Sequence, residues 1–294
     1  MSLIRFFVRR SLRARGYSDY AITGMIENIQ RELLQRTENS FLKKIWAVRH
    51  GFHPDKLTWY GLTKENHLDY LSDFEYAWLF PNNGHFNFWL SNKVTYKYLL
   101  EPFSQFLPDY YFQIERGEIL CLMDCPRSIP ATADGIISLL HDKGALAAKP
   151  IIGLGGEGFF KFSFFDGEYF LNDNPSAEVE IIGLISNWRS ANSGYVITEY
   201  LKPHHEFARI WSRTPNSMRI TVARMPEEKA KIIWAFTRFG AQSTGVVDNT
   251  HAGGIINLVD IESGFFTDGA KIVNKKLIDC KYHPDTGALV EGTV

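Results

Sequence analysis

The spacing of hydrophobic residues divides the chain into an N-terminal helical part and a later part that mixes strands with helices. In the first part, apolar residues recur every three or four positions, which predicts helices over residues 1–15 and 20–35. Loops with many aromatic residues follow, and a turn-forming Pro-Asn-Asn-Gly cluster at 81–84 marks a candidate boundary. We therefore expect residues 1–90 to form a mainly helical, aromatic-rich region.

Beyond residue 90, apolar runs bounded by turn residues predict short strands between single helices. The expected helices lie at residues 92–107, 132–142, 176–188 and 206–211. The expected strands flank a glycine-rich loop near residue 155 and recur at residues 195–201, 218–225, 231–239, 255–260 and 269–273. Thr132 is placed to cap the second of these helices and Gly144 to end it. Strands in hairpins interrupted by single helices indicate an α+β fold.

The candidate chemistry centres on a lysine that precedes the glycine-rich loop. Lys149 lies in a predicted strand, and four glycines follow it: Gly153, Gly155, Gly156 and Gly158. A second strand comes after the loop and turns at Asp166-Gly167, which is a strong hairpin signal. Glycines let backbone N–H groups approach a polyphosphate. An ammonium group about 4 Å from a phosphate oxygen contributes up to roughly 4 kcal/mol at an effective dielectric constant near 20. Together these features predict a nucleotide clamp on a β-hairpin.

Other phosphate-binding loops are excluded by the residues on either side. A dinucleotide-binding loop needs a helix to start inside the motif, and a strand follows here. A Walker A loop ends in Gly-Lys-Ser/Thr, whereas Gly158 is followed by Phe159-Phe160. A protein kinase carries its lysine after the loop, and Lys149 comes before it. A glycine-rich hairpin without a ligand remains the alternative.

Composition restricts the class of protein. The chain has 294 residues, a formal net charge of −1 and 22 Phe, 13 Tyr and 7 Trp, as expected for a globular chain without a nucleic-acid partner. Two of its three cysteines form a C-x3-C pair, and no second pair is present, so a zinc site is not expected. We expect the cysteines to be buried free thiols in a reducing cytosol. No apolar stretch approaches about 18 residues and no signal-peptide pattern is present, which favours a cytoplasmic protein.

The first 50 residues are basic, with 10 Lys and Arg against 4 Asp and Glu. In the first predicted helix, Leu3, Ile4, Phe7 and Val8 share one face, and another face carries the arginines at positions 5, 9 and 13. Such a helix suits the surface of an anionic membrane, such as the inner face of the cell membrane. The alternative is a helix that docks on its own domain with a solvated basic face.

The order of the motifs resembles the ATP-grasp superfamily, and within it the sugar-transfer-associated ATP-grasp proteins of polysaccharide gene clusters. The resemblance covers about residue 45 to the end of the chain. It rests on these residues: Tyr70-Leu71-Ser72-Asp73, Lys93, Leu107-Pro108-Asp109-Tyr110-Tyr111, Lys149-Pro150, Glu199-Tyr200-Leu201, Asn216-Ser217-Met218-Arg219, Arg238, Val247-Asp248-Asn249 and Gly253-Gly254.

The resemblance implies two α+β lobes, at residues 91–200 and 201–294, that hold ATP between them. Lys93 and Lys149 match the two phosphate-binding lysines, with the glycine loop closing over the phosphates. The resemblance also implies that Glu199, Tyr200 and Leu201 form a hinge whose backbone meets adenine. Its implied catalytic residues are Arg219, Arg238 and Asn249.

The magnesium site is where this sequence departs from the family. Family members hold Mg²⁺ with an Asp and with a Glu-x-Asn on a late strand, and such oxygen ligands suit this hard cation. No Glu-x-Asn follows Asp260-Ile261-Glu262, and Asp260 itself is expected to be a hairpin residue next to Ser263-Gly264. The resemblance therefore implies that the metal ligands lie beyond Val294 and that the chain is cut short at its C-terminus.

The implied activity is ATP-dependent ligation of a carboxylate to an amine through an acyl phosphate. The family implies a carboxylated sugar or an amino acid as the substrate, whether free or sugar-linked. Three alternatives remain: a nucleotide-binding fragment without catalysis, an ATP-dependent sugar or lipid kinase, and a carbohydrate-binding module on residues 1–90. The oligomeric state is not predicted.

Overall fold

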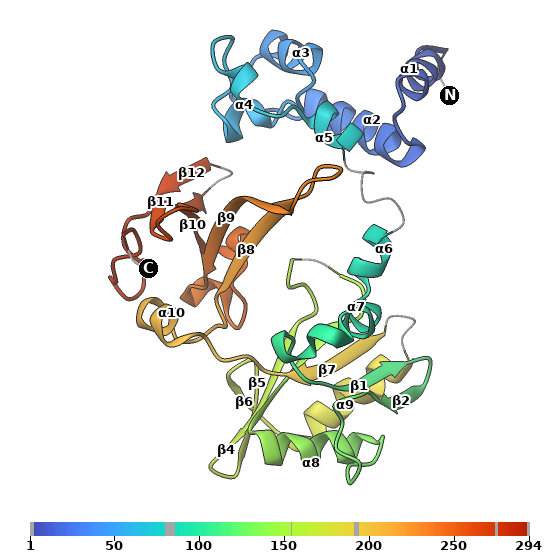
Figure 1. Cartoon of the computed structure of the whole chain (residues 1–294), viewed down its shortest axis with the longest axis vertical. Coiled ribbons are helices and arrows are strands. Elements are labelled where there is room, and N and C mark those ends of the chain that lie inside the picture. Colours follow the sequence, from blue (N-terminus) through green and yellow to red (C-terminus); the bar gives the residue numbers. More distant parts are fainter. Residues whose placement is uncertain (1–2, 80–85, 154, 191–193, 274–275, 293–294) are drawn as a thin grey trace. The chain divides into compact units, whose positions relative to one another are not determined.

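A computed structural model describes residues 3–79, 86–153, 155–190, 194–273 and 276–292 (Figure 1). The turn cluster expected at 81–84 lies outside these residues. The chain divides into two compact units, residues 1–87 with 274–277 and residues 88–273 with 278–294.

The N-terminal unit is helical, and the predicted helices near 1–15 and 20–35 are confirmed. Two serines explain where helices begin, because Ser18 Oγ accepts the N–H of Ala21 and Ser40 Oγ accepts the N–H of Lys43. The helices of this unit are α1 Leu3–Ala14, α2 Asp19–Leu34, α3 Phe41–Arg49, α4 Lys56–Trp59, the 3-10 helix His67–Asp69 and α5 Asp73–Leu79.

Helix α1 packs on α2 through both apolar and basic side chains. Leu12 is buried with Ile22 and Met25 of α2. Arg9 donates to the Thr23 hydroxyl at 3.0 Å, and Arg13 pairs with Asp19 at 2.6 Å. The side chains of Leu3, Ile4, Arg5 and Phe7 lie outside those described. These contacts fit the docked alternative, and contact with a membrane stays a prediction. No helix among the described residues is long and apolar enough to cross a membrane.

The rest of the chain confirms the predicted α+β fold, with two antiparallel sheets. The seven-stranded sheet has the order β2-β1-β7-β3-β4-β5-β6, and the five-stranded sheet has the order β12-β11-β10-β9-β8. The strands of the first sheet are β1 Tyr110–Glu115, β2 Glu118–Cys121, β3 Ala145–Pro150, β4 Phe160–Phe165, β5 Glu168–Leu171, β6 Asn174–Ser176 and β7 Tyr195–Glu199. Those of the second are β8 Ser217–Ala223, β9 Lys231–Phe239, β10 Ile255–Val259, β11 Phe266–Val273 and β12 Lys276–Asp279.

The helices of this part are α6 Phe86–Ser91, α7 Lys93–Leu99, a 3-10 helix Glu101–Phe106, α8 Ala133–Lys143, α9 Glu178–Ser190, α10 His205–Ile210 and the 3-10 helices Gln242–Thr244 and Thr250–Ala252. The predicted caps of α8 are confirmed. Thr132 accepts the N–H of Gly135, and Gly144 ends the helix at φ +73°, a conformation that favours glycine.

The main core lies on one face of the seven-stranded sheet, where α8 and α9 pack (Figure 1). Its members include Leu139, Leu140, Phe162, Ile185 and Ile197, each fully buried.

The same strand alternation that fills this core leaves a second set of side chains on the opposite face of the sheet. Residues directly opposite in an antiparallel pair share a face, and Lys149 is opposite Val196, while Ala147 is opposite Lys161 and Thr198. Because Leu146 and Ala148 belong to the core, Lys149 points to the face away from α8 and α9.

Several predictions of individual elements were wrong or incomplete. The helix expected at 92–107 ends at Leu99 and continues as a 3-10 helix. Pro102 explains this break, since proline lacks an N–H and disfavours α conformation in the residue before it. Strands β1, β2, β6 and β12 were not predicted. Cys121 is exposed and Cys125 is half-buried, which corrects the expectation of buried thiols for all but Cys280. Asp260 does serve as a turn residue, because its Oδ1 accepts the N–H and the hydroxyl of Ser263.

Candidate functional site

A cavity of about 370 Å³ gathers most of the side chains singled out in the sequence. We call it the cationic cavity, because four cationic side chains line it together with only two carboxylates. It is lined by Lys93, Lys149, Pro150, Gly153, Gly155, Gly156, Glu157, Phe159, Pro215, Ser217, Arg219, Arg238, Val246, Val247, Asp248 and Asn249. Strands and loops of both sheets therefore contribute to it.

Lys149 lies near the end of β3, on the face of the sheet away from the helices. Burial, together with the charge of Lys93, lowers the pKa of its ammonium group to about 8. Its Nζ lies 5.9 Å from the centre of the Tyr110 ring. Among the described residues, no carboxylate forms an ion pair with it, so the charge is available for an anionic ligand.

Lys93 is the first residue of α7, where the side chain of Asn92 caps the helix by accepting the N–H of Thr95. Its Nζ donates to the carbonyl oxygens of Pro150 at 2.8 Å and Gly153 at 3.1 Å. Burial lowers its pKa. Lys93 therefore holds the entry of the glycine loop and keeps one N–H for a ligand.

The glycine loop uses conformations that other residues rarely adopt. Gly155, Gly156 and Gly158 have φ values of +71°, +78° and +69°. Gly158 does not line the cavity. A Cβ at Gly158 would lie 2.9 Å from both Pro150 Cγ and Tyr195 Oη, so this glycine permits close packing beneath the loop. Residue 154 lies outside those described.

Arg238 belongs to a network that sequence reasoning missed. Its guanidinium donates to Ser217 Oγ at 2.7 and 3.1 Å and lies 3.4 Å from Asp248 Oδ1. The Ser217 hydroxyl donates in turn to Asp248 Oδ2. Ser217 and Arg238 are directly opposite in the β8–β9 register. The position of Ser217, two residues before Arg219 on one strand, was the available signal, because such residues share a face.

Arg219 is the more available of the two arginines. It is exposed and lies opposite Phe236, with its guanidinium carbon 5.8 Å from that ring. Within the described part of the chain no carboxylate pairs with it, so its donors remain available to the cavity.

Asn249 joins the two sides of the cavity. Its Nδ2 donates to the carbonyl oxygen of Gly155 at 2.6 Å, and its Oδ1 accepts the N–H of His251 at 3.1 Å. A Cβ at Gly156 would lie 3.4 Å from Val247 Cγ1, so the same two loops also touch beside this bond. Both ends of the amide are used within the protein, which makes Asn249 a tether of the glycine loop. Its expected catalytic role stays a prediction.

The structure does not bring the expected hinge residues into the cationic cavity. The N–H of Glu199 donates to the carbonyl oxygen of Asp109 at 2.8 Å, and its carboxylate accepts the N–H of Asp109 at 3.3 Å. Leu201 is exposed and lines neither this cavity nor the next.

Tyr200 lines a different cavity, of about 440 Å³, which we call the hinge cavity. There Lys161 pairs with Asp173 at 2.7 Å and lies 4.7 Å from the centre of the Tyr200 ring. Burial, with a smaller contribution from Asp173, raises the pKa of Tyr200 to about 12. Lys161 shares its face of the sheet with Ala147 and Lys149, so both cavities lie along one sheet face.

The described residues do not fit a magnesium site of the family's kind. Asp248 and Glu157 line the cationic cavity, but Asp248 is already engaged by Arg238 and Ser217. Across the described parts of the chain, no group of three His, Cys, Asp or Glu side chains could hold a metal ion.

Comparison with known proteins identifies the family. The model of the sugar-transfer-associated ATP-grasp family matches residues 77–294, and the chain belongs to this family, as the motif order predicts. A solved structure, D-alanyl-alanine synthetase A from Vibrio cholerae O1 biovar eltor, matches with a TM-score of 0.32 and 11% identity. The match covers 60% of this chain and 53% of that enzyme, so the chain spans about half of that enzyme's length. No curated protein matches the chain.

Proposed function

We propose that the chain binds ATP with its phosphates in the cationic cavity. The observation that carries this proposal is the convergence of Lys93, Lys149, Arg219 and Arg238 with the glycine loop on one cavity in a member of an ATP-grasp family. Because four cationic side chains and two carboxylates line the cavity, it favours a polyanionic ligand. The backbone of the glycine loop adds N–H donors that an exposed lysine cluster would lack.

The base end of ATP is proposed to lie toward the hinge cavity, along the sheet face that Lys149 shares with Lys161. Support comes from the strand register that places both lysines on that face. Tyr200 supplies an aromatic wall there. In this arrangement Glu199, Tyr200 and Leu201 contact the base or ribose, as the family resemblance implies.

The proposed reaction is ligation of a carboxylate to an amine. A carboxylate oxygen attacks the γ-phosphorus of ATP, the bond between that phosphorus and the β,γ-bridging oxygen breaks, and ADP leaves. The amine then attacks the carbonyl carbon of the acyl phosphate, inorganic phosphate leaves, and the amine proton passes to solvent. Arg219, with unused donors, is suited to the transferring phosphoryl group, while Arg238 is held in place by Ser217 and Asp248.

The proposed substrate is a carboxylated sugar or an amino acid, and the proposed role is in capsular or exopolysaccharide biosynthesis in the cytoplasm. Both proposals rest on the family's name and on the resemblance. Magnesium is the metal that the family implies as a counter-charge for the phosphates.

The binding proposal is tested by substituting Lys149, which is half-buried. Lys149→Ala should weaken ATP binding by about 100-fold or more, because it removes an interaction of up to roughly 4 kcal/mol. Isothermal titration calorimetry measures this change. Lys231→Ala is the matched control, since that lysine pairs with Glu228 on an exposed strand end. Equal affinity of Lys149→Ala and the wild-type protein would refute the proposed phosphate site.

Product analysis tests the reaction separately. A ligase releases ADP and inorganic phosphate and forms an amide, whereas a sugar or lipid kinase releases ADP and leaves no free phosphate. ATP binding without ADP release, in the presence of candidate acids, amines and magnesium, would instead indicate a nucleotide-binding protein without catalysis.

A further inference from the structure

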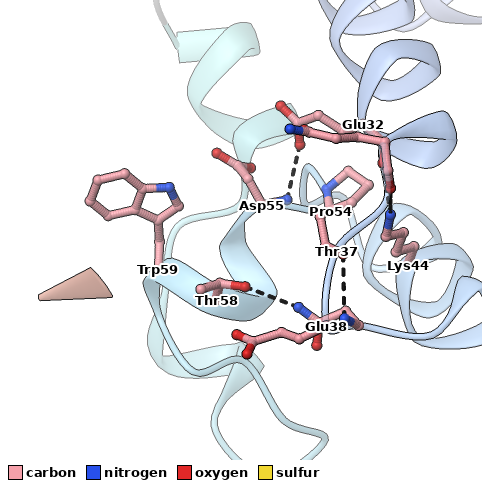
Figure 2. Close-up of a pocket in the computed structure, with 10 residues that line it drawn as sticks. Glu32, Thr37, Glu38, Lys44, Pro54, Asp55, Thr58 and Trp59 are labelled. Atoms are coloured by element: carbon pink, nitrogen blue, oxygen red, sulfur yellow. Dashed lines mark hydrogen bonds between the residues drawn. The ribbon is translucent and has the colours of Figure 1, made fainter. Parts of the chain in front are cut away.

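The N-terminal unit contains a cavity of its own, of about 240 Å³, which lies outside the part of the chain that the family matches (Figure 2). We call it the N-terminal pocket. It is lined by Glu32, Gln35, Thr37, Glu38, Asn39, Lys44, Pro54, Asp55, Thr58 and Trp59. It shares no residue with the cationic cavity, so a ligand here is independent of the proposed ATP site.

The pocket is held by buried polar contacts. Lys44 is 4% exposed, and its Nζ donates to the carbonyl oxygens of Glu32 and Gln35 at the end of α2. A lysine in this position satisfies carbonyls that the helix leaves unpaired. The carboxylate of Glu32 accepts the N–H of Asp55 at 2.9 Å, which fixes the start of α4 against α2. Asn39 donates to the Thr58 hydroxyl across the pocket at 3.0 Å.

One carboxylate of the pocket lacks a full set of partners. Asp55 Oδ2 is bound to Lys56 at 3.0 Å. Asp55 Oδ1 is buried, and within the described residues it accepts no hydrogen bond. An unmet buried acceptor is costly, and because the Asp55 side chain as a whole is 32% exposed, a small rotation would present this oxygen to a hydroxyl or N–H donor of a ligand.

The chemistry of the lining favours a hydroxyl-rich ligand without negative charge. Three carboxylates line the pocket, and its one lysine is already bound to backbone carbonyls. Anions are therefore disfavoured. In Figure 2 the indole of Trp59 and the carboxylate of Asp55 extend to the same side of the pocket. An aromatic face can pack on the C–H face of a sugar ring while carboxylates accept its hydroxyl groups.

The pocket also continues past Trp59. A neighbouring hollow of about 690 Å³ is lined by Arg31 and Leu34 and by four residues of the pocket itself, Glu32, Gln35, Asp55 and Trp59. Because the two cavities share these four residues, they form one continuous groove. Arg31 lies 3.7 Å from the Glu32 carboxylate, so the groove as a whole holds three carboxylates against this paired arginine and the engaged Lys44. We propose that this groove binds a short stretch of a non-acidic glycan, with Trp59 at its centre.

The test uses the full chain and a panel of trisaccharides in saturation-transfer NMR and calorimetry: maltotriose, cellotriose, chitotriose and trigalacturonic acid. At least one neutral trisaccharide should bind, and the acidic one should bind at least about tenfold more weakly. Trp59→Ala should weaken the bound trisaccharide by about tenfold or more, while Trp59→Phe keeps an aromatic face and most of the affinity. Asp55→Asn keeps the shape of the side chain but removes its charge, and it should weaken trisaccharide binding severalfold. This second variant tests the groove even if Trp59→Ala fails to fold.

Two matched variants distinguish binding in this groove from binding elsewhere on the chain. Trp78→Ala removes a half-exposed tryptophan of the same unit that does not line the groove and should leave binding unchanged. Lys149→Ala should also leave it unchanged, even if ATP binding is lost. The proposal is overturned if no neutral trisaccharide binds, if trigalacturonic acid binds as tightly, or if Trp59→Ala and Asp55→Asn both bind like the wild-type protein.

Discussion

At the scale of single residues, Lys149 has to satisfy two opposing demands. Its surroundings are mostly desolvated, and burial together with Lys93 lowers its pKa to about 8. A phosphate ligand, however, prefers the charged ammonium form. Binding of ATP should therefore raise the pKa of Lys149 again and take up protons when it occurs near pH 8.

This linkage predicts a pH dependence of ATP affinity. Because the pKa of the free protein's Lys149 is about 8, the protonated fraction falls from about nine-tenths to about one-tenth between pH 7 and pH 9. ATP affinity should decline about tenfold between pH 7 and pH 9, where the γ-phosphate stays ionised and the free lysine loses its proton. Calorimetry at a series of pH values measures this decline.

Lys149→Arg provides the control, because a guanidinium stays protonated across this range. Its affinity for ATP should be nearly independent of pH between 7 and 9, whatever its absolute value. An equal decline in the wild-type protein and in Lys149→Arg would assign the pH dependence to another group.

At the scale of elements, the glycine loop between β3 and β4 is joined to the loop that precedes β10. The polar link between them is the hydrogen bond from Asn249 Nδ2 to Gly155 O, and Val247 packs on Gly156 beside it. Replacement of Asn249 by alanine removes this bond, worth roughly 1 kcal/mol, together with the local bond from the N–H of His251 to Asn249 Oδ1.

Asn249→Ala should therefore loosen the loop without unfolding the sheet. We expect faster hydrogen exchange at residues 153–158 and an ATP affinity lower by about fivefold. His251→Ala is the matched control in the same short 3-10 segment, since only its backbone N–H meets Asn249. If exchange in the glycine loop is the same in both variants, Asn249 does not tether the loop.

The elements that the sequence predicts correctly are those specified by neighbouring residues. The caps of α8 at Thr132 and Gly144 and the hairpin turn at Asp166-Gly167 depend on side chains within a few positions. The Ser217–Arg238–Asp248 network was not predictable in this way. It depends on the β8–β9 register and on a loop 31 residues from Ser217. The roles of Glu199, Tyr200 and Leu201 at adenine rest on family resemblance and stay a prediction. Of these three, Tyr200 lines the hinge cavity and none lines the cationic cavity.

At the scale of the whole molecule, the chain has two compact units, and each has hydrophobic clusters of its own. The cationic cavity and the hinge cavity belong to the second unit. The N-terminal pocket belongs to the first. A ligand stabilises only the cooperative unit that binds it, so the two proposed ligands should act on different unfolding events.

Differential scanning calorimetry of the full chain should accordingly resolve two transitions. ATP at 100 times its dissociation constant should stabilise one of them by about 2.7 kcal/mol, which corresponds to a rise in Tm of roughly 5–10 °C. The bound trisaccharide should raise the other transition instead. Lys149→Ala should abolish the effect of ATP and preserve that of the trisaccharide, while Trp59→Ala should do the reverse. A single transition that both ligands raise together would mean that the two units unfold as one, which contradicts their separate stabilisation.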